Sequence, residues 1–202
     1  MRIAIISDSH DNIVNIEKAL KWINKEGIKT IIHCGDFCSP STVFKVFMQN
    51  FSGEFHSVHG NVGDPEATEA KAKEYKNVHI YNWHYSSSKK AIIKEPKKIN
   101  NKTDWSYINS MMGCGEIIID NIKIAFTHSP NQGKELAQSG NYDYVFYGHT
   151  HRPWIEELKT NNEKLITMMA NPGTLAGMFY KATFAVLDTE TNKLELKILE
   201  RI

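Results

Sequence analysis

Side chains that can bind metal ions occur in five short clusters along the chain of 202 residues. The clusters read DSH, HCGD, HGN, FTHS and YGHTH, and they contain the candidate metal ligands Asp8, His10, Asp36, Asn61, His128, His149 and His151. Each cluster closely follows a short apolar run of the kind that predicts a β-strand. Loops that leave parallel strands at their carboxyl ends meet at one edge of a sheet. We therefore expect the five clusters to form one site.

The donor atoms of this set indicate which ions it would bind and what chemistry would follow. Four imidazoles, two carboxylates and one amide are too many for one ion, but they suffice for two if Asp36 bridges the pair. Nitrogen and oxygen donors without thiolate suit Mn, Fe, Zn, Co or Ni better than Mg or Ca. Two such ions roughly 3.5–4 Å apart stabilise an in-line displacement at phosphorus. The set therefore predicts metal-dependent hydrolysis of a phosphate ester.

The elements that must position these residues follow an α/β pattern. In the first half of the chain, buried strands alternate with helices, which indicates a mainly parallel sheet. The expected strands of this half span residues 2–7, 30–34, 54–59 and 77–81, and the expected helices span residues 13–27, 42–50 and 65–75.

The second half of the chain predicts a mixture of parallel and antiparallel strands. Asn121 separates two apolar runs that read as a hairpin, and Asn161-Asn162 is a tight-turn pair between two more. A short helix is expected at residues 131–140, and the expected strands span residues 116–120, 123–128, 143–148, 154–160, 163–169, 182–188 and 193–200. This mixture predicts two sheets packed face to face, with helices on both outer surfaces.

Length, composition and charge exclude several classes of protein. With 41% hydrophobic and 23% charged residues, residues 1–202 are expected to form a single globular domain. A net charge of +1 provides no general field for nucleic acid or a membrane surface. The apolar runs are too short for a membrane span, and the N-terminus does not read as a secretory signal. Three cysteines, Cys34, Cys38 and Cys114, make no disulfide framework, so we expect reduced thiols and a cytoplasmic protein.

A lysine-rich insertion is expected at about residues 84–115, where no helical or strand period is evident. Residues 86–104 contain six lysines and two acidic residues, and aromatic residues flank them. Such a composition can hold phosphates and stack on bases, so nucleotide or nucleic-acid binding is one interpretation. The interpretation that we favour is a solvated loop, a lid or a contact between subunits of a homo-oligomer.

The ordered pattern D-x-H, G-D, G-N, H and G-H-x-H, from Asp8 to His151, resembles that of the calcineurin-like metallophosphoesterase superfamily. The chain is most similar to its small single-domain prokaryotic phosphodiesterases, also in the NPGT segment at residues 171–174. The resemblance covers the chain except the insertion. It implies a four-layer α-β-β-α sandwich of two packed mixed sheets with helices outside.

The same resemblance implies roles for the candidate ligands. Two divalent transition-metal ions are expected, with manganese favoured over nickel, cobalt, iron or zinc. A hydroxide that bridges the ions would attack phosphorus, and Asn61 and His128 are the expected catalytic residues, Asn61 through contact with the phosphoryl group. One ion would be held by Asp8, His10, Asp36 and His151, and the other by Asp36, Asn61, His128 and His149.

Three positions depart from the pattern of that family. Val62 replaces a histidine that is thought to protonate the leaving group or to steady the transition state, and valine can do neither, so we expect weak activity on poor leaving groups. Gly63 displaces the following acidic residue to Asp64, and Ser129-Pro130 follows the histidine that glycine usually follows. The other histidines are expected to be strand or surface residues rather than ligands: His33, His56, His59, His79 and His84.

These observations favour a phosphodiesterase that acts on a small phosphodiester substrate. A protein-binding scaffold of the same fold is the first alternative, because a retromer subunit of the family works mainly as such a scaffold. The loss of the family's histidine at the position of Val62 resembles a change toward that role. The complete set of seven candidate ligands favours catalysis instead. A phosphomonoesterase is the second alternative, which the missing acid disfavours because monoester leaving groups need a proton more.

Overall fold

The computed structural model describes residues 1–81, 113–161 and 165–202. Its first sheet has the strand order β11-β10-β1-β2-β3-β4. Strands β1 to β4 are parallel, whereas β10 pairs antiparallel with β1 and with β11. The strands are β1 (Arg2–Ile6), β2 (Thr30–His33), β3 (Glu54–Val58), β4 (Val78–Tyr81), β10 (Thr183–Asp188) and β11 (Lys193–Ile198).

The second sheet is also mixed and has the strand order β5-β6-β7-β9-β8. Strands β6, β7 and β9 are parallel, and the two outer strands pair antiparallel with their neighbours. The strands are β5 (Cys114–Ile119), β6 (Ile122–Thr127), β7 (Tyr144–Phe146), β8 (Trp154–Lys159) and β9 (Ile166–Asn171).

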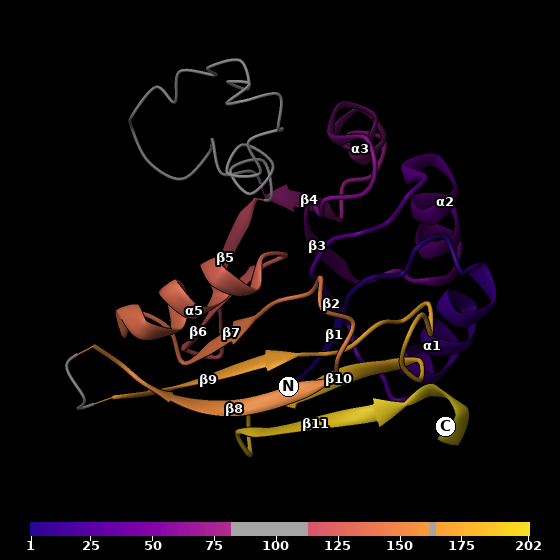
Figure 1. Cartoon of the computed structure of the whole chain (residues 1–202). Helices are drawn as coiled ribbons and strands as arrows, with labels where there is room; N and C mark the ends of the chain where they lie inside the picture. The colour runs from indigo at the N-terminus through magenta and orange to yellow at the C-terminus, as the bar shows by residue number, and fades with distance from the viewer. Residues whose placement is uncertain (82–112, 162–164) are drawn as a thin grey trace.

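The helices cover the outer face of each sheet (Figure 1). Helices α1 (Ile13–Lys25), α2 (Pro40–Asn50) and α3 (Pro65–Ala72) lie beside the first sheet, and α5 (Pro130–Ser139) packs on the second. A short 3₁₀ helix, η2 (Leu199–Arg201), follows β11. The predicted four-layer α-β-β-α sandwich of two mixed sheets is thus confirmed.

Strand β1 illustrates why the sequence folds into these layers. Its side chains alternate between the two faces, as successive residues of a strand must. Ile3 and Ile5 belong to the core between the two sheets, whereas Ala4 and Ile6 belong to the core between the first sheet and its helices. Both faces are buried, so the strand reads as a continuous apolar run. A third core lies between the second sheet and α5.

The observed elements differ from the sequence predictions at a few boundaries. Helix α2 begins at Pro40 rather than at residue 42, because Ser39 precedes it with extended backbone and proline fits the first helical turn. Most of the predicted insertion, including His84, lies outside the described residues, as does Asn162 of the predicted turn. The insertion was predicted to extend to residue 115, but β5 already begins at Cys114.

The structure also bears on the expectations about the cysteines and about membrane spans. The three cysteines are free, with Cys34 buried and the other two half-buried. Among the helices of residues 1–81, 113–161 and 165–202, none has the length and apolar character needed to cross a membrane.

Candidate metal centre

Five loops bring all seven predicted ligands to one edge of the two sheets. The loops after β1, β2 and β3 carry Asp8 and His10, Asp36, and Asn61, while those after β6 and β7 carry His128, His149 and His151. Three loops come from the first sheet and two from the second, so the site spans both sheets. This is the edge at which parallel strands end, as the sequence predicted.

Five of the candidate ligands have left-handed backbone conformations, although none of them is glycine. The φ angles are 51° at Asp8, 38° at His10, 61° at Asp36, 70° at His149 and 59° at His151. Non-glycine residues rarely adopt positive φ, and such strain gathers at functional sites. The fold therefore holds these loops in conformations that aim the side chains inward rather than in those the backbone prefers.

Two glycines permit the close approach of the ligand loops. A Cβ atom on Gly60 would lie 1.9 Å from Asp36 Oδ1, and one on Gly148 would lie 2.2 Å from Ser7 Oγ. Any side chain at either position would displace Asp36 or Ser7. Close backbone approach beside the ligands therefore requires glycine at both positions.

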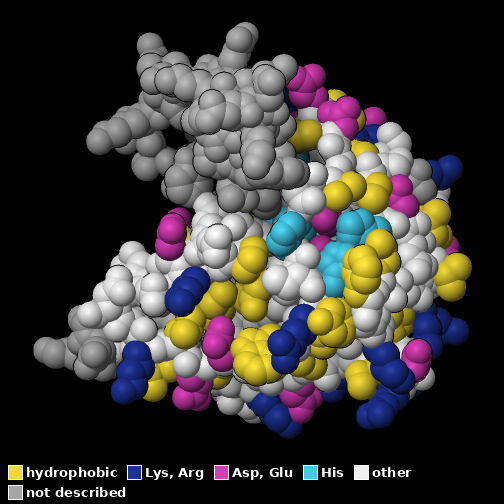
Figure 2. Space-filling view, in the orientation of Figure 1, with side chains coloured by type: hydrophobic (Ala, Val, Ile, Leu, Met, Phe, Trp, Pro, Cys, Tyr) yellow, Lys and Arg dark blue, Asp and Glu magenta, His cyan; other side chains and the backbone are white. Residues whose placement is uncertain are grey.

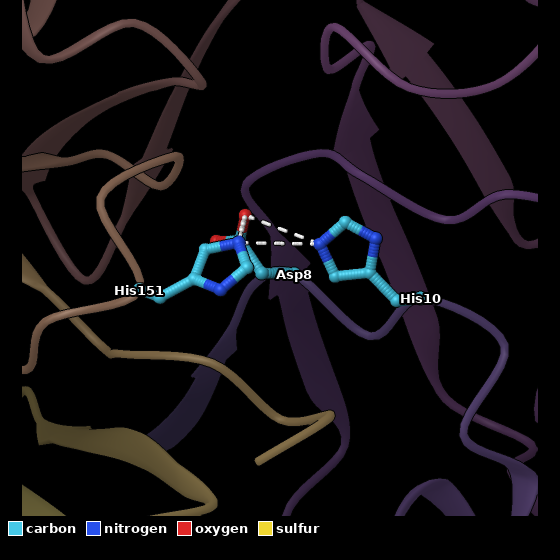
Figure 3. Close-up of side chains that lie close together, drawn as sticks. All are labelled: Asp8, His10 and His151. Carbon is cyan, nitrogen blue, oxygen red and sulfur yellow. Dashed lines mark hydrogen bonds and ion pairs between the residues drawn. The ribbon is translucent and has the colours of Figure 1, made fainter. Parts of the chain in front are cut away.

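Asp8, His10 and His151 form the first group of candidate ligand atoms (Figure 3). The Nε2 atoms of both imidazoles point toward each other and toward the Asp8 carboxylate, with His10 Nε2 and His151 Nε2 3.2 Å apart. Asp8 Oδ1 is 3.1 Å from His151 Nε2 and 3.9 Å from His10 Nε2. The Nδ1 atom of His10 lies 3.5 Å from Cys38 Sγ on its other side.

Asp36, Asn61, His128 and His149 form the second group. Asn61 Oδ1 lies 2.9 Å from His128 Nε2 and 2.7 Å from His149 Nδ1. His128 Nδ1 is 2.7 Å from the Cys34 carbonyl oxygen, which can only accept, so Nδ1 carries a proton. In the neutral ring Nε2 then has the lone pair, and it points toward the other ligands.

Asp36 stands between the two groups. Its Oδ2 atom is 3.8 Å from His10 Nε2 and 3.4 Å from His128 Nε2. Its Oδ1 atom accepts a hydrogen bond of 2.8 Å from the Val62 backbone N–H. One carboxylate oxygen thus faces a histidine of each group, which is the arrangement that a bridging ligand requires.

The unsatisfied atoms of the first group fit a bound cation. Asp8 Oδ2 accepts hydrogen bonds from Ser7 Oγ and the His149 backbone N–H, but Asp8 Oδ1 is buried and has no hydrogen bond of acceptable geometry. Burying an unpaired carboxylate oxygen is costly unless a cation or a donor meets it. The nearby imidazole nitrogens and oxygens are donors of the kind that divalent transition-metal ions prefer.

The electrostatics of the second group reflect a contact between His128 and Asp36. Burial acts to raise the pKa of Asp36, but the hydrogen bond and charge of His128 outweigh it, so the pKa lies below its usual value. Burial acts to lower the pKa of His128, and the Asp36 carboxylate raises it above its usual value. In the first group, contact with the Asp8 carboxylate raises the pKa of His151. Protons therefore compete with cations at both groups.

His33 connects the loop of Asp8 and His10 with the loop of Asp36. It is fully buried at the end of β2, and Ser9 Oγ lies 3.0 Å from its Nε2. The Gly35 N–H donates to its Nδ1 over 3.1 Å, so the neutral ring carries its proton on Nε2 and donates to Ser9. The prediction that His33 is a strand residue is correct, but its link between the loops was missed. Its place inside HCGD was the available signal.

The NPGT segment supports the loops from the second sheet. Asn171 donates through Nδ2 to the Gly148 carbonyl and to Thr150 Oγ1, at 2.9 Å each. Thr174 Oγ1 donates to the Asp8 carbonyl over 3.1 Å. The segment therefore fixes the loop of His149 and His151 against that of Asp8.

The three departures from the family pattern each have a structural outcome. Val62 is 39% exposed beside Asn61, and its side chain has no proton to give. Asp64 is the N-cap of α3 and accepts from the Ala67 N–H. Ser129, directly after His128, is the N-cap of α5, and Pro130 begins that helix. Asp64 and Ser129 thus serve as helix caps.

The remaining described histidines lie outside the two groups. His56 and His79 are on neighbouring strands of the first sheet, with their rings stacked 4.8 Å apart. His59 is buried just after β3 and lines a small pocket with Asp36 and Val62.

Figure 2 shows histidine side chains at the surface of one face, with hydrophobic side chains directly beside them. The centre is therefore open to a ligand from that side.

Comparison with known proteins gives one consistent family. A model of the calcineurin-like phosphoesterase superfamily domain matches residues 1–192. The chain is 32% identical to a phosphodiesterase of Methanocaldococcus jannaschii, over 99% of this chain and all of that protein.

Solved structures agree with this result. The structure of an archaeal phosphodiesterase is 26% identical, covers 98% of this chain and 99% of its own, and has a TM-score of 0.72. A phosphoesterase of E. coli is 16% identical, with coverage of 98% and 100% and a TM-score of 0.56. The second likeness concerns the fold alone.

Proposed function

The chain belongs to the calcineurin-like phosphoesterase superfamily, and from this premise we propose that it is a phosphodiesterase that uses two divalent metal ions. The observation that carries the proposal is the position of Asp36, whose Oδ2 faces a histidine of each ligand group. Phosphoester hydrolysis follows from the family, whereas the paired ions and the preference for diesters are our inference. Manganese is the metal that we favour.

The residues of the centre would have different roles in such a reaction. Asp8, His10 and His151 would hold one ion, Asn61, His128 and His149 the other, and Asp36 both. When bound, the two ions would supply the hydroxide that attacks phosphorus and would neutralise charge on the phosphate. Asn61 would also contact the phosphoryl group through its amide. The Cys34 carbonyl fixes the tautomer of His128, so that His128 presents Nε2.

A preference for diesters is supported by the chemistry at Val62. A positioned general acid typically contributes about a hundred- to ten-thousand-fold to a hydrolysis rate. Val62 cannot give a proton, so leaving groups that need one are disfavoured. The M. jannaschii relative is a phosphodiesterase, which agrees with this preference.

The test is hydrolysis of bis(p-nitrophenyl) phosphate by protein stripped with a chelator and then supplied with Mn, Ni, Co, Zn or Mg. The monoester p-nitrophenyl phosphate is assayed in parallel. We expect turnover that depends on metal, is faster on the diester, and is lost in His151→Ala. His79→Ala, a histidine substitution on β4 outside both ligand groups, is the matched control and should retain full activity.

Two other results would redirect the assignment. Faster turnover of the monoester would identify a phosphomonoesterase. Two bound ions without turnover of either ester would favour a protein-binding scaffold, and capture of a protein partner would be the next experiment.

The same proposal includes the wider setting of the protein. We propose that residues 1–202 form one metallophosphoesterase domain, which the family match over residues 1–192 supports. A cytoplasmic location is supported by the three free cysteines. The substrate is a small phosphodiester. Nucleotide or nucleic-acid binding through residues 84–115 and assembly into a homo-oligomer stay predictions, because the residues concerned lie mostly outside those described.

A further inference from the structure

An exposed aromatic side chain lies beside the first ligand group. Phe179 is 86% exposed, and the centroid of its ring is 5.5 Å from that of the His151 ring, with the rings tilted by 47°. Its neighbours Met178 and Tyr180 are 42% and 46% exposed. A cluster of exposed hydrophobic side chains next to a polar site indicates a surface that a ligand covers.

The loop that carries Phe179 is fixed to the ligand loops. The Leu175 N–H donates to the Ser7 carbonyl over 2.9 Å, and the Ala176 N–H donates to the Asp8 carbonyl over 3.1 Å. From the other side, Asn12 Nδ2 donates to the Ala176 carbonyl over 2.9 Å. After Phe179 the chain is tied again, because the Thr183 N–H donates to the Thr174 carbonyl. The loop that carries Phe179 is therefore anchored at both ends, beside the ligand loops.

The backbone of Phe179 is also strained. Its φ angle is 65°, in the left-handed region that bulky residues avoid. A glycine would adopt this conformation without the strain. An aromatic side chain that is both exposed and strained gains little for folding, so its placement calls for a role outside the fold.

We infer that Phe179 is a specificity-determining residue that stacks on an aromatic ring of the substrate, either a nucleobase or an aryl ester group. The inference rests on the proposed phosphodiesterase function and names the substrate class for the same site. A phosphate bound between the two ligand groups carries its ester groups outward, and the one on the His151 side extends over Phe179. Val62 borders the opposite group, so the two exposed hydrophobic side chains contact different parts of the substrate.

The test compares three diesters that release the same p-nitrophenolate. They are the p-nitrophenyl esters of thymidine 5′-phosphate, phenyl phosphate and methyl phosphate. In Phe179→Ala, we expect KM to rise about five- to tenfold for the thymidine and phenyl esters, the effect of losing one stacked ring. KM for the methyl ester should stay within about twofold, because a methyl group has no ring to stack.

Two further variants separate stacking from a structural effect. Phe179→Trp keeps a ring and should keep the wild-type preference. Ile118→Ala removes a hydrophobic side chain that is 68% exposed from β5 and should change none of the three KM values. A rise for the thymidine ester alone identifies the ring as a nucleobase, and a rise for the phenyl ester alone identifies it as an aryl group. An equal rise for all three esters that Phe179→Trp abolishes assigns the stacking to the p-nitrophenyl ring that they share. An equal rise that Phe179→Trp retains, or no change for any ester, would overturn the inference.

A binding measurement tests Phe179 even if the proposed function fails. Calorimetry of the metal-loaded protein with phenylphosphonate and methylphosphonate, neither of which is hydrolysed, gives the preference for a ring without turnover. Wild type should bind phenylphosphonate several-fold more tightly, and Phe179→Ala should bind the two alike. Absence of turnover in wild type would contradict the phosphodiesterase, whereas an equal preference in both proteins would contradict only the role of Phe179.

Discussion

In the ligand group of Asp8, His10 and His151, the candidate ligand atoms satisfy one another only in part, although Asp8 Oδ1 lies 3.1 Å from His151 Nε2. Asp8 Oδ1 is buried without a hydrogen bond, and two imidazole nitrogens approach to 3.2 Å. In the group of Asp36, Asn61, His128 and His149, the same kinds of atoms pair internally. Asn61 Oδ1 lies close to both of its histidines, and Asp36 pairs with His128.

This difference indicates what each group contributes before any ion binds. The second group is already ordered by its own hydrogen bonds and by one ion pair. The first group also contains a carboxylate–imidazole contact, between Asp8 and His151, but Asp8 Oδ1 has no hydrogen bond of acceptable geometry and His10 Nε2 faces another imidazole nitrogen. A cation therefore satisfies more of its atoms and stabilises it more. Because a ligand that binds only the folded state stabilises it, the first group should contribute most of the stabilisation by metal.

Asp36→Asn is expected to have the largest effect, because it breaks the link between the two groups. An amide in place of the carboxylate lacks the charge that would join two ions. Paired metal binding should be lost, and diester hydrolysis should fall by more than about a hundredfold, beyond what substitutions outside the ligand set usually cost. Metal analysis after dialysis gives the ions per chain. Two retained ions would refute the bridging role and leave the groups independent.

Val62→His tests whether the second group lacks only an acid. A histidine beside Asn61 supplies the missing proton donor, so hydrolysis of the phenyl ester of thymidine 5′-phosphate should accelerate by about a hundredfold. The p-nitrophenyl ester, whose leaving group needs no proton, should change little. Val62→Ala is the control and should alter neither rate. Equal acceleration of both esters would show that the histidine acts by another route.

Asp8→Asn sharpens the comparison through stability. In metal-free protein the neutral amide removes a buried charge whose Oδ1 atom has no hydrogen bond, which should outweigh the lost contact with His151. Its oxygen keeps the Ser7 and His149 hydrogen bonds. The variant should be more stable than metal-free wild type by about 1–2 kcal/mol in urea unfolding, and metal should stabilise it less. Asp36→Asn is the matched comparison and should destabilise, because it loses the pairing with His128. A destabilised Asp8→Asn protein would contradict the asymmetry of the groups.

The pH dependence of stability gives a further test at His33, which joins the loops of Asp8 and Asp36. Burial lowers its pKa to about 3, so the folded protein keeps it neutral while the unfolded chain protonates it near 6.5. The unfolded state then binds more protons, and stability falls as the pH drops from about 6.5 toward 3. His33→Leu should flatten this dependence by about 1.4 kcal/mol per pH unit, the value for one proton.

His56 provides the internal control for that measurement. Burial and then His79 lower its pKa to about 4, so His56→Leu should flatten the dependence only down to about pH 4. Urea unfolding of the metal-free variants at several pH values separates the two. A His33→Leu protein with an unchanged slope between pH 4 and 6 would show that His33 does not titrate with folding.

Much of this architecture could be predicted from sequence, because its signals are local. The apolar run of β1 and the capping Asp64-Pro65 pair lie within single windows of the chain, and both elements form as expected. The convergence of the five ligand clusters followed from one rule about parallel strands.

What the sequence could not provide are contacts between distant segments. The place of β10 beside β1, the link of His33 to Ser9 and the contact of Phe179 with His151 each join residues that no local pattern relates. The left-handed conformation of the ligands was also missed. Glycine in a sequence is a signal for positive φ, whereas aspartate and histidine are not. Here only the packing of the loops imposes that conformation.

The left-handed ligand residues also predict how this chain would respond to selection. Glycine in place of any of them would relieve about 1 kcal/mol of backbone strain while removing a donor atom from the centre. A library of metal-free protein selected for heat resistance alone should therefore accumulate glycine at these positions, except at Asp36, where the pairing with His128 would be lost. A library selected for turnover should reject glycine at all five. Selection for stability and selection for turnover would thus favour different residues at the same positions. The stability that this fold gives up is therefore concentrated at its metal centre.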